Sequence, residues 1–135
     1  MAIITIPASE LQKGQPVPDG WYFAKLVSFV QQENSKKDGW NFVPIFSFKD
    51  PKTGEERSQK DNFSNKALGI KFPDFYVAIT GTKIDPSKDL KINTEDIKIG
   101  TELWIKMSLN AYGGRLNNKV DDYMHKSEKP SETPF

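Results

Sequence analysis

The chain has 135 residues, and 19 lysine and arginine residues against 18 aspartate and glutamate residues give it a formal charge of +1. This length suits one domain, the 12% aromatic content argues against a wholly disordered chain, and no apolar run is long enough to span a membrane. The absence of cysteine excludes disulfides and thiolate sites, and the near-neutral charge means that a polyanion would have to be bound by a local basic patch.

The first half of the chain predicts three strands. Residues 21–30 are rich in aromatic and β-branched side chains, and Asp38-Gly39 predicts the hairpin that follows. Residues 40–48 form the expected second strand, in which Pro44 indicates an edge position or a bulge because proline cannot donate to a ladder. After a turn rich in proline and glycine, residues 55–63 are expected to form a third, more polar strand.

A helical pattern follows over residues 65–80. Pro73 suits a first helical position, and Gly81 suits a stop at the carboxyl end. Helical spacing predicts that four side chains face the core: Phe72, Phe75, Tyr76 and Ile79. After a polar loop, residues 93–97 predict one capped turn.

The last part of the body predicts a hairpin of two strands. The fourth strand begins at Gly100-Thr101 and has the clearest alternation in the chain, with apolar side chains at Leu103, Ile105, Met107 and Leu109. Residues 110–114 form the expected hairpin loop, and residues 115–123 form the fifth strand.

This order predicts a mainly β fold, a five-stranded Greek-key barrel of the OB-fold type with one helical insertion between strands 3 and 4. A small β-grasp or an open α+β sheet is the alternative. We expect one domain over residues 1–123 and a disordered tail over residues 124–135, because the tail composition cannot bury enough apolar surface to order itself. Residues 1–7 lack the basic region of a secretion signal.

Catalysis and cofactor binding receive little support. The single histidine, His125, lies in a polar stretch and cannot by itself supply a zinc site, and no phosphate-binding glycine loop is present. We therefore expect a protein that is not an enzyme and that has no cofactor and no metal. A nuclease that uses magnesium bound by carboxylates is the enzymatic alternative.

OB-folds bind their ligands along strands 2 and 3 and through the loops that join strands 1–2 and 4–5. The aromatic and basic residues at these places form the candidate site: Lys36, Lys37, Trp40, Arg57, Lys60, Trp104, Lys106, Tyr112 and Arg115. Aromatic rings stack on unpaired bases and cations neutralise phosphates, so this mixture is typical of a surface that binds single-stranded nucleic acid.

Each candidate also has a purely structural interpretation. Trp40 could cap the end of the barrel, Trp104 could belong to a second apolar layer, and the two loop lysines could simply be solvated. Arg115 could pair with Asp121 or Asp122. Tyr22, Phe23, Leu26 and Phe42 are assigned to the core.

The sequence ends in Ser-Glu-Thr-Pro-Phe, and Glu132, Pro134 and Phe135 offer a partner protein an acid, a stiff extended approach and an aromatic ring. Pro134 and Phe135 resemble the tip of bacterial single-stranded-DNA-binding proteins, which ends in an acidic run followed by Ile-Pro-Phe. Here Thr133 replaces the isoleucine and the acidic run is thin.

The body resembles the small single-stranded-DNA-binding or recombination-associated proteins of tailed bacteriophages. The matching segments are Pro18-Asp19-Gly20-Trp21-Tyr22-Phe23-Ala24, Lys37-Asp38-Gly39 and Tyr112-Gly113-Gly114-Arg115-Leu116-Asn117-Asn118-Lys119-Val120. The resemblance implies an OB-fold, single-stranded DNA as partner, a role in phage DNA replication or recombination, and a place in the cytoplasm of the infected host cell.

The expected function is sequence-independent binding of single-stranded DNA, with the tail recruiting replication or recombination proteins. The alternative is a protein–protein adaptor of a phage replisome or assembly that does not touch nucleic acid, and the near-neutral charge favours it. No membrane partner is expected, and the sequence is compatible with a homo-oligomer.

Overall fold

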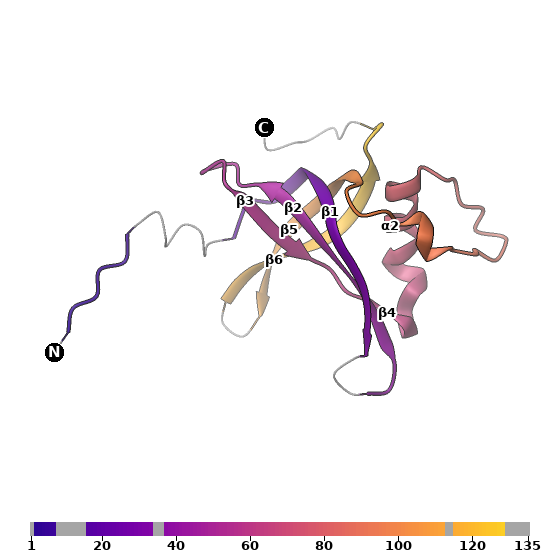
Figure 1. Ribbon diagram of the computed structural model, residues 1–135, viewed down its shortest axis with the longest axis horizontal. Helices are drawn as coiled ribbons and strands as arrows, with labels where there is room; N and C mark the ends of the chain where they lie inside the picture. The colour runs from indigo at the N-terminus through magenta and orange to yellow at the C-terminus, as the bar shows by residue number, and fades with distance from the viewer. Residues whose placement is uncertain (1, 8–15, 34–36, 113–114, 129–135) are drawn as a thin grey trace.

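The computed structural model describes residues 2–7, 16–33, 37–112 and 115–128; for Tyr112 and Arg115 it describes the backbone alone. The elements in chain order are β1 (Gly20–Glu33), β2 (Trp40–Lys49), β3 (Glu56–Lys60), β4 (Phe63–Ser64), the 3₁₀ turn η1 (Asn65–Ala67), α2 (Leu68–Thr80), the 3₁₀ turn η2 (Thr94–Asp96), β5 (Glu102–Tyr112) and β6 (Arg115–His125) (Figure 1). The fold is therefore mainly β, with one helix between the third and fourth long strands, as the sequence predicts.

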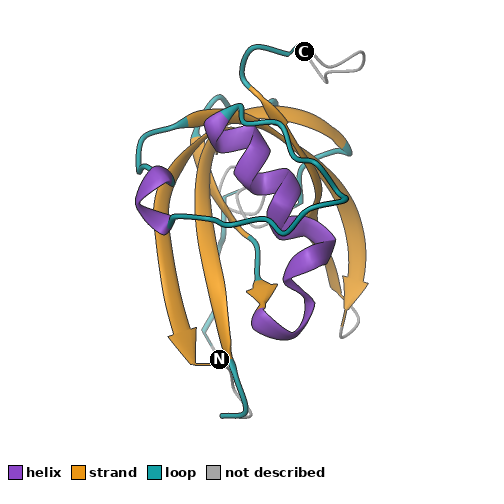
Figure 2. Ribbon diagram, turned by 90° about the vertical axis from the view of Figure 1, so that its right-hand side faces the viewer, coloured by secondary structure: helices purple, strands orange, loops and turns teal. Residues whose placement is uncertain are grey.

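The strands form one antiparallel sheet in the order β3-β2-β1-β5-β6, and β4 pairs with β2 beside β3. The sheet curves strongly, and α2 lies across it (Figure 2). In the described part of the chain, no ladder joins β6 to β3, so the sheet is not closed into a barrel by backbone pairing.

Alternation along the strands separates an inner face from an outer face of the sheet. On β5, Leu103, Ile105 and Met107 are fully buried, as their spacing predicts, while Leu109 is 42% exposed because it lies beyond the start of β1. The inner face and α2 enclose a core rich in aromatic rings. Rings that contact one another in this core include Phe29, Phe42, Phe46, Phe63, Phe72, Phe75 and Tyr123.

The helix buries the four side chains that were expected to face the core, and Gly81 ends it with a positive φ of 75°. The expected position of Pro73 is wrong, because α2 begins at Leu68 and Pro73 lies inside it. The turn η1, capped by the Ser64 side chain, starts the helical path earlier than the proline indicates. Pro73 then removes only the backbone bond to the carbonyl of Gly69.

No helix among the described residues is long and apolar enough to cross a membrane.

The expectation for Pro44 is also wrong, since β2 lies between β1 and β3 and the bulge is in β1, between Leu26 and Ser28. The carbonyl of Pro44 accepts from the backbone N–H of Asp61, where β2 changes partner from β3 to β4. The N–H and C=O groups of one strand residue point to the same side of the strand. The missing N–H of Pro44 would therefore point into the gap between the β3 and β4 ladders, where no ladder bond is lost.

Side chains bridge the seam between β3 and β6. Gln59 Nε2 donates to the carbonyl of Asn118 over 3.2 Å. Asp61 accepts from the Tyr123 hydroxyl and lies 2.7 Å from Lys71 Nζ, which also donates to the carbonyl of Val120. These contacts tie β6 and α2 to the segment after β3 without a backbone ladder.

The strand β6 continues two residues beyond the expected domain boundary at residue 123. His125 is paired with Leu103. Its ring lies against Gly81 at the end of α2, where a Cβ atom added to the glycine would be 3.1 Å from Nε2. The rest of the predicted tail, from residue 129, lies outside the described residues.

We expect stability to fall at alkaline pH through Tyr22. Burial raises its pKa to about 12, and Asp50 and Asp19 add to this effect. An unfolded tyrosine titrates near pH ~10, so the folded state holds this proton more tightly and the contribution of Tyr22 is complete below that pH. The free energy of unfolding should then fall by up to ~1.4 kcal/mol per pH unit as pH rises from about 10 to about 12. Urea denaturation across this window should show a smaller slope in Tyr22→Phe; an unchanged slope would contradict the assignment.

Candidate functional site

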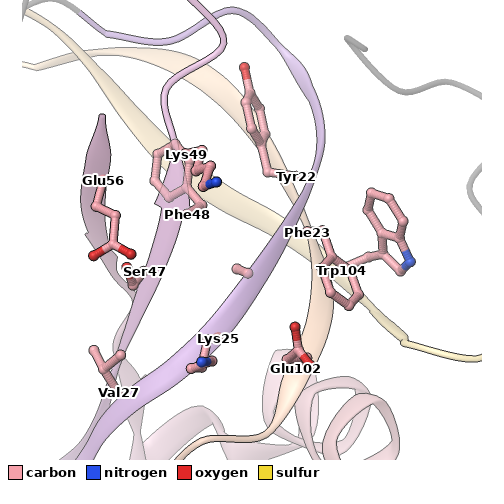
Figure 3. A pocket seen from close by; sticks show the side chains of 11 residues that line it. Tyr22, Phe23, Lys25, Val27, Ser47, Phe48, Lys49, Glu56, Glu102 and Trp104 are labelled. Atoms are coloured by element: carbon pink, nitrogen blue, oxygen red, sulfur yellow. The ribbon is translucent and has the colours of Figure 1, made fainter. Parts of the chain in front are cut away.

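An open concavity of about 580 Å³ lies on the outer face of the sheet, across β1, β2, β3 and β5 (Figure 3). Its lining residues are Tyr22, Phe23, Ala24, Lys25, Val27, Ser47, Phe48, Lys49, Glu56, Glu102 and Trp104. Cross-strand pairing accounts for the cluster, because Phe23 opposes Trp104 and Lys25 opposes both Glu102 and Ser47.

The concavity holds an aromatic pair that is open to solvent. The rings of Phe23 and Trp104 meet edge to face with centroids 5.0 Å apart, and Phe23 is 44% exposed. This arrangement fixes both rings while leaving π surface accessible. The pair can therefore accept a flat apolar group by stacking.

Charged side chains of both signs surround this pair. Lys25 and Lys49 line the concavity with Glu56 and Glu102, and Lys106 is exposed beside it on β5, opposite Trp21. Lys60 is exposed on β3 and belongs to the same outer face, because it pairs with Ile45 in phase with Ser47 and Lys49. The lysines can reach anionic groups one at a time, but the glutamates keep the local charge from becoming strongly positive.

Trp40 does not join this surface. It lies on the inner face at the start of β2, where its ring contacts Phe42 at 4.7 Å and its backbone N–H donates to Asn65 Oδ1. Trp40 and Trp104 are thus on opposite faces of the sheet. The expected convergence of these two tryptophans on one cleft is wrong, because even-numbered residues of β2 face the core.

Arg57 is also directed elsewhere. Its Nη1 atom lies 3.0 Å from Oδ2 of Asp50, a carboxylate that is only 5% exposed. Burial alone would raise the pKa of Asp50, but hydrogen bonds from the Lys52 N–H, Arg57 and the Thr53 N–H outweigh it and hold that pKa below its ordinary value. Arg57 therefore stabilises the turn between β2 and β3 and faces away from Lys60.

The structure places the remaining candidates in or next to loops. Lys37 is exposed in the β1–β2 connection with a positive φ of 58°, and Lys36 lies outside the described residues. Tyr112 and Arg115 are paired where β5 ends and β6 begins, but their side chains are not described. Glu132, Pro134 and Phe135 are outside the described residues as well.

Sequence reasoning missed Phe23, Lys25 and Lys49. Phe23 was assigned to the core, yet Tyr22, Ala24 and Leu26 set the buried phase of β1 and leave Phe23 on the other face. Strict alternation from Ala24 was the signal that could have identified it, since small buried residues report the phase as well as large ones.

Comparison with models of known protein families gives no match, and comparison with curated proteins gives none either. Within the described ranges, no group of three or more histidine, aspartate or glutamate side chains is arranged to hold a metal ion. The outer concavity with its aromatic pair is therefore the feature on which we base a functional interpretation.

Proposed function

We propose that the protein binds single-stranded DNA without sequence preference across the outer face of its sheet. The observation that carries this proposal is the partly exposed Phe23–Trp104 pair in an open concavity, with Lys25, Lys49 and Lys106 around it. A phenylalanine and a tryptophan that are paired and partly exposed form an apolar patch, and such patches mark sites that a ligand covers.

The chemistry of this surface suits an unpaired polynucleotide. Each stacked base contributes about 1–3 kcal/mol, and every base has a π face, so stacking does not select a sequence. Lys25, Lys49 and Lys106, which lie on three different strands, meet phosphates and release their counterions. Tyr112 and Arg115, at the tip of the β5–β6 hairpin, and Lys36 and Lys37, in the β1–β2 connection, extend the proposed path.

We further propose that the sheet is an open variant of the OB-fold barrel. The strand order β3-β2-β1-β5-β6 and the helix between the third and fourth long strands support this interpretation. In a closed barrel β3 would pair with β6; here the contacts of Gln59, Asp61 and Lys71 with β6 take that place. The outer concavity then includes residues of the second and third strands, which OB-folds use for oligonucleotides, whereas the Phe23–Trp104 pair lies on the first and fourth long strands.

The biological setting belongs to the same proposal. The Tyr-Gly-Gly-Arg segment and the Pro-Phe end support a phage protein of DNA replication or recombination, acting in the cytoplasm of the infected host cell. The tail, through Glu132, Pro134 and Phe135, would recruit replication or recombination proteins. Pull-down of host replication proteins should weaken when Phe135 is deleted.

Replacement of the aromatic pair tests the site. We expect Phe23→Ala and Trp104→Ala each to weaken binding of a fluorescent oligodeoxythymidine by about tenfold or more, because each removes a stacking platform. Fluorescence anisotropy at low salt measures the effect. Ile99→Ala, at a side chain that is 57% exposed and outside the concavity, is the matched control and should bind as the parent protein does. Equal affinity of all three variants would exclude this surface.

The adaptor function remains the second candidate because Glu56 and Glu102 balance Lys25 and Lys49 within the concavity. An adaptor would use Phe23 and Trp104 to contact a protein, and oligonucleotides would then leave tryptophan emission unchanged. Absence of any binding to single-stranded DNA at low salt, with the protein folded, would favour the adaptor.

A further inference from the structure

Trp21 is a partly exposed tryptophan that is not among the residues lining the outer concavity. It pairs with Lys106 across the β1–β5 ladder, in phase with the pair formed by Phe23 and Trp104. Its neighbour Tyr22 is 1% exposed and belongs to the core. Because successive side chains of a strand alternate between the two faces of a sheet, Trp21 lies on the outer face, two residues along β1 from Phe23.

The indole of Trp21 forms a second aromatic surface next to the first. Trp104 precedes Lys106 by two residues on β5, so Trp21 and Trp104 are diagonal neighbours across the ladder. Such positions are about 7–8 Å apart, within reach of one bound ligand. Among the described residues no ring contact joins Trp21 to Phe23 or Trp104, so its indole is separate from their edge-to-face pair.

Lys106 is adjacent to both aromatic surfaces. It is directly opposite Trp21 and is the next residue on the same face of β5 after Trp104. Its side chain is exposed and takes part in no ion pair within the part of the chain that the structure describes. A single-stranded polynucleotide has one phosphate between two successive bases, so the order ring, cation, ring on this face matches the order base, phosphate, base.

The carboxylates at the two ends of this surface differ in their partners. Asp19, two residues before Trp21, and Asp122, which is paired with Lys106, each accept a backbone N–H. The side chains of Glu56 and Glu102, which line the concavity, have no hydrogen bond and no ion pair with any described residue. A phosphate is therefore repelled less at the Trp21 end of the surface than beside these two glutamates.

We propose that Trp21 is a second stacking residue, and that a single strand of DNA passes from the Phe23–Trp104 pair over Lys106 to Trp21. This inference rests on the proposed function and adds a direction to it. The strand leaves the concavity toward the start of β1, and not toward Val30, which is 46% exposed further along β1. Lys106 then meets the phosphate between two stacked bases.

Substitutions that keep or remove the ring test this role. Trp21→Leu keeps an apolar side chain without a ring, whereas Trp21→Phe keeps a ring. We expect Trp21→Leu to weaken binding of oligodeoxythymidine about fivefold or more in fluorescence anisotropy at low salt, and Trp21→Phe to bind nearly as the parent protein does. Val30→Ala is the matched control on the same strand and should leave affinity unchanged. Equal affinity of Trp21→Leu and the parent protein, or a loss confined to Val30→Ala, would overturn the proposal.

Emission of Trp21 as the single tryptophan separates direct contact from an indirect effect. The substitutions Trp40→Phe and Trp104→Phe leave Trp21 alone and keep a ring at position 104. We expect oligodeoxythymidine to quench this emission to saturation. If anisotropy shows binding while the emission stays unchanged, Trp21 does not contact the strand; this inference is then wrong and the proposed function stands. If the folded parent protein does not bind oligodeoxythymidine, both are wrong.

Discussion

Replacing Phe75 by alanine is expected to lower the free energy of unfolding by about 3–5 kcal/mol. Phe75 is fully buried, and its ring lies within 5.2–6.1 Å of the rings of Phe63, Tyr123, Phe29, Phe46 and Phe72. Rings cannot rotate freely to fill the space, so the substitution removes both the transfer free energy and the contacts around the cavity. Because a small domain is stable by only about 5–15 kcal/mol, this single change brings the protein close to unfolding.

Urea denaturation of Phe75→Ala and Ile70→Ala measures this difference within one helix. Ile70 is 73% exposed, so its replacement should change stability by no more than about 0.5 kcal/mol. Similar losses in the two variants would mean that α2 does not pack on the sheet through Phe75.

Replacing Asp61 by alanine should cost about 2–3 kcal/mol, because it removes the acceptor that holds the seam between β3 and β6. The Tyr123 hydroxyl would lose its hydrogen-bond partner in a buried site. Burial raises the pKa of this tyrosine, and the charge of Asp61 raises it further. Lys71 is partly exposed and keeps its bond to the carbonyl of Val120, which keeps the loss below the about 3–5 kcal/mol of a broken, fully buried pair.

Hydrogen exchange locates the effect of this substitution. In Asp61→Ala the backbone amides of β6 near Val120 should exchange faster, whereas those in the β1–β2 ladder should keep their protection relative to global stability. Asp89→Ala, at an exposed carboxylate in the loop before η2, should match the parent protein. If Asp61→Ala is as stable as Asp89→Ala, side chains do not hold the seam.

The elements of this fold could be predicted where local pattern and burial agree. Leu103, Ile105 and Met107 alternate in sequence and are all buried, and Phe72, Phe75 and Ile79 are buried at the helical spacing that predicts it. The turn at residues 94–96 has its expected cap, with Asn93 Oδ1 accepting from the Glu95 N–H. These features depend on neighbours in the chain, which the sequence displays directly.

The site could be predicted only in part, because the face that a side chain occupies depends on distant partners. The start of β1 is apolar in both phases, so Tyr22 and Phe23 by themselves do not tell which of the two is buried, and only Ala24 and Leu26 further along the strand report the phase. The sequence does not show that Arg57 pairs with Asp50, because Asp50 becomes buried beside the guanidinium only in the folded protein. Trp40 is partly buried because β4 and η1 lie beside the start of β2, a contact that its own segment does not encode.

Fluorescence of Trp104 as the single tryptophan tests the proposed function most directly. The chain has three tryptophans, so Trp21→Phe and Trp40→Phe leave Trp104 alone on the outer face. Titration with oligodeoxythymidine at low salt should quench its emission to saturation, and added salt should restore it as the phosphate contacts are lost. Emission that stays unchanged while the folded protein is titrated with oligodeoxythymidine, and then with oligodeoxyadenosine, would contradict the account.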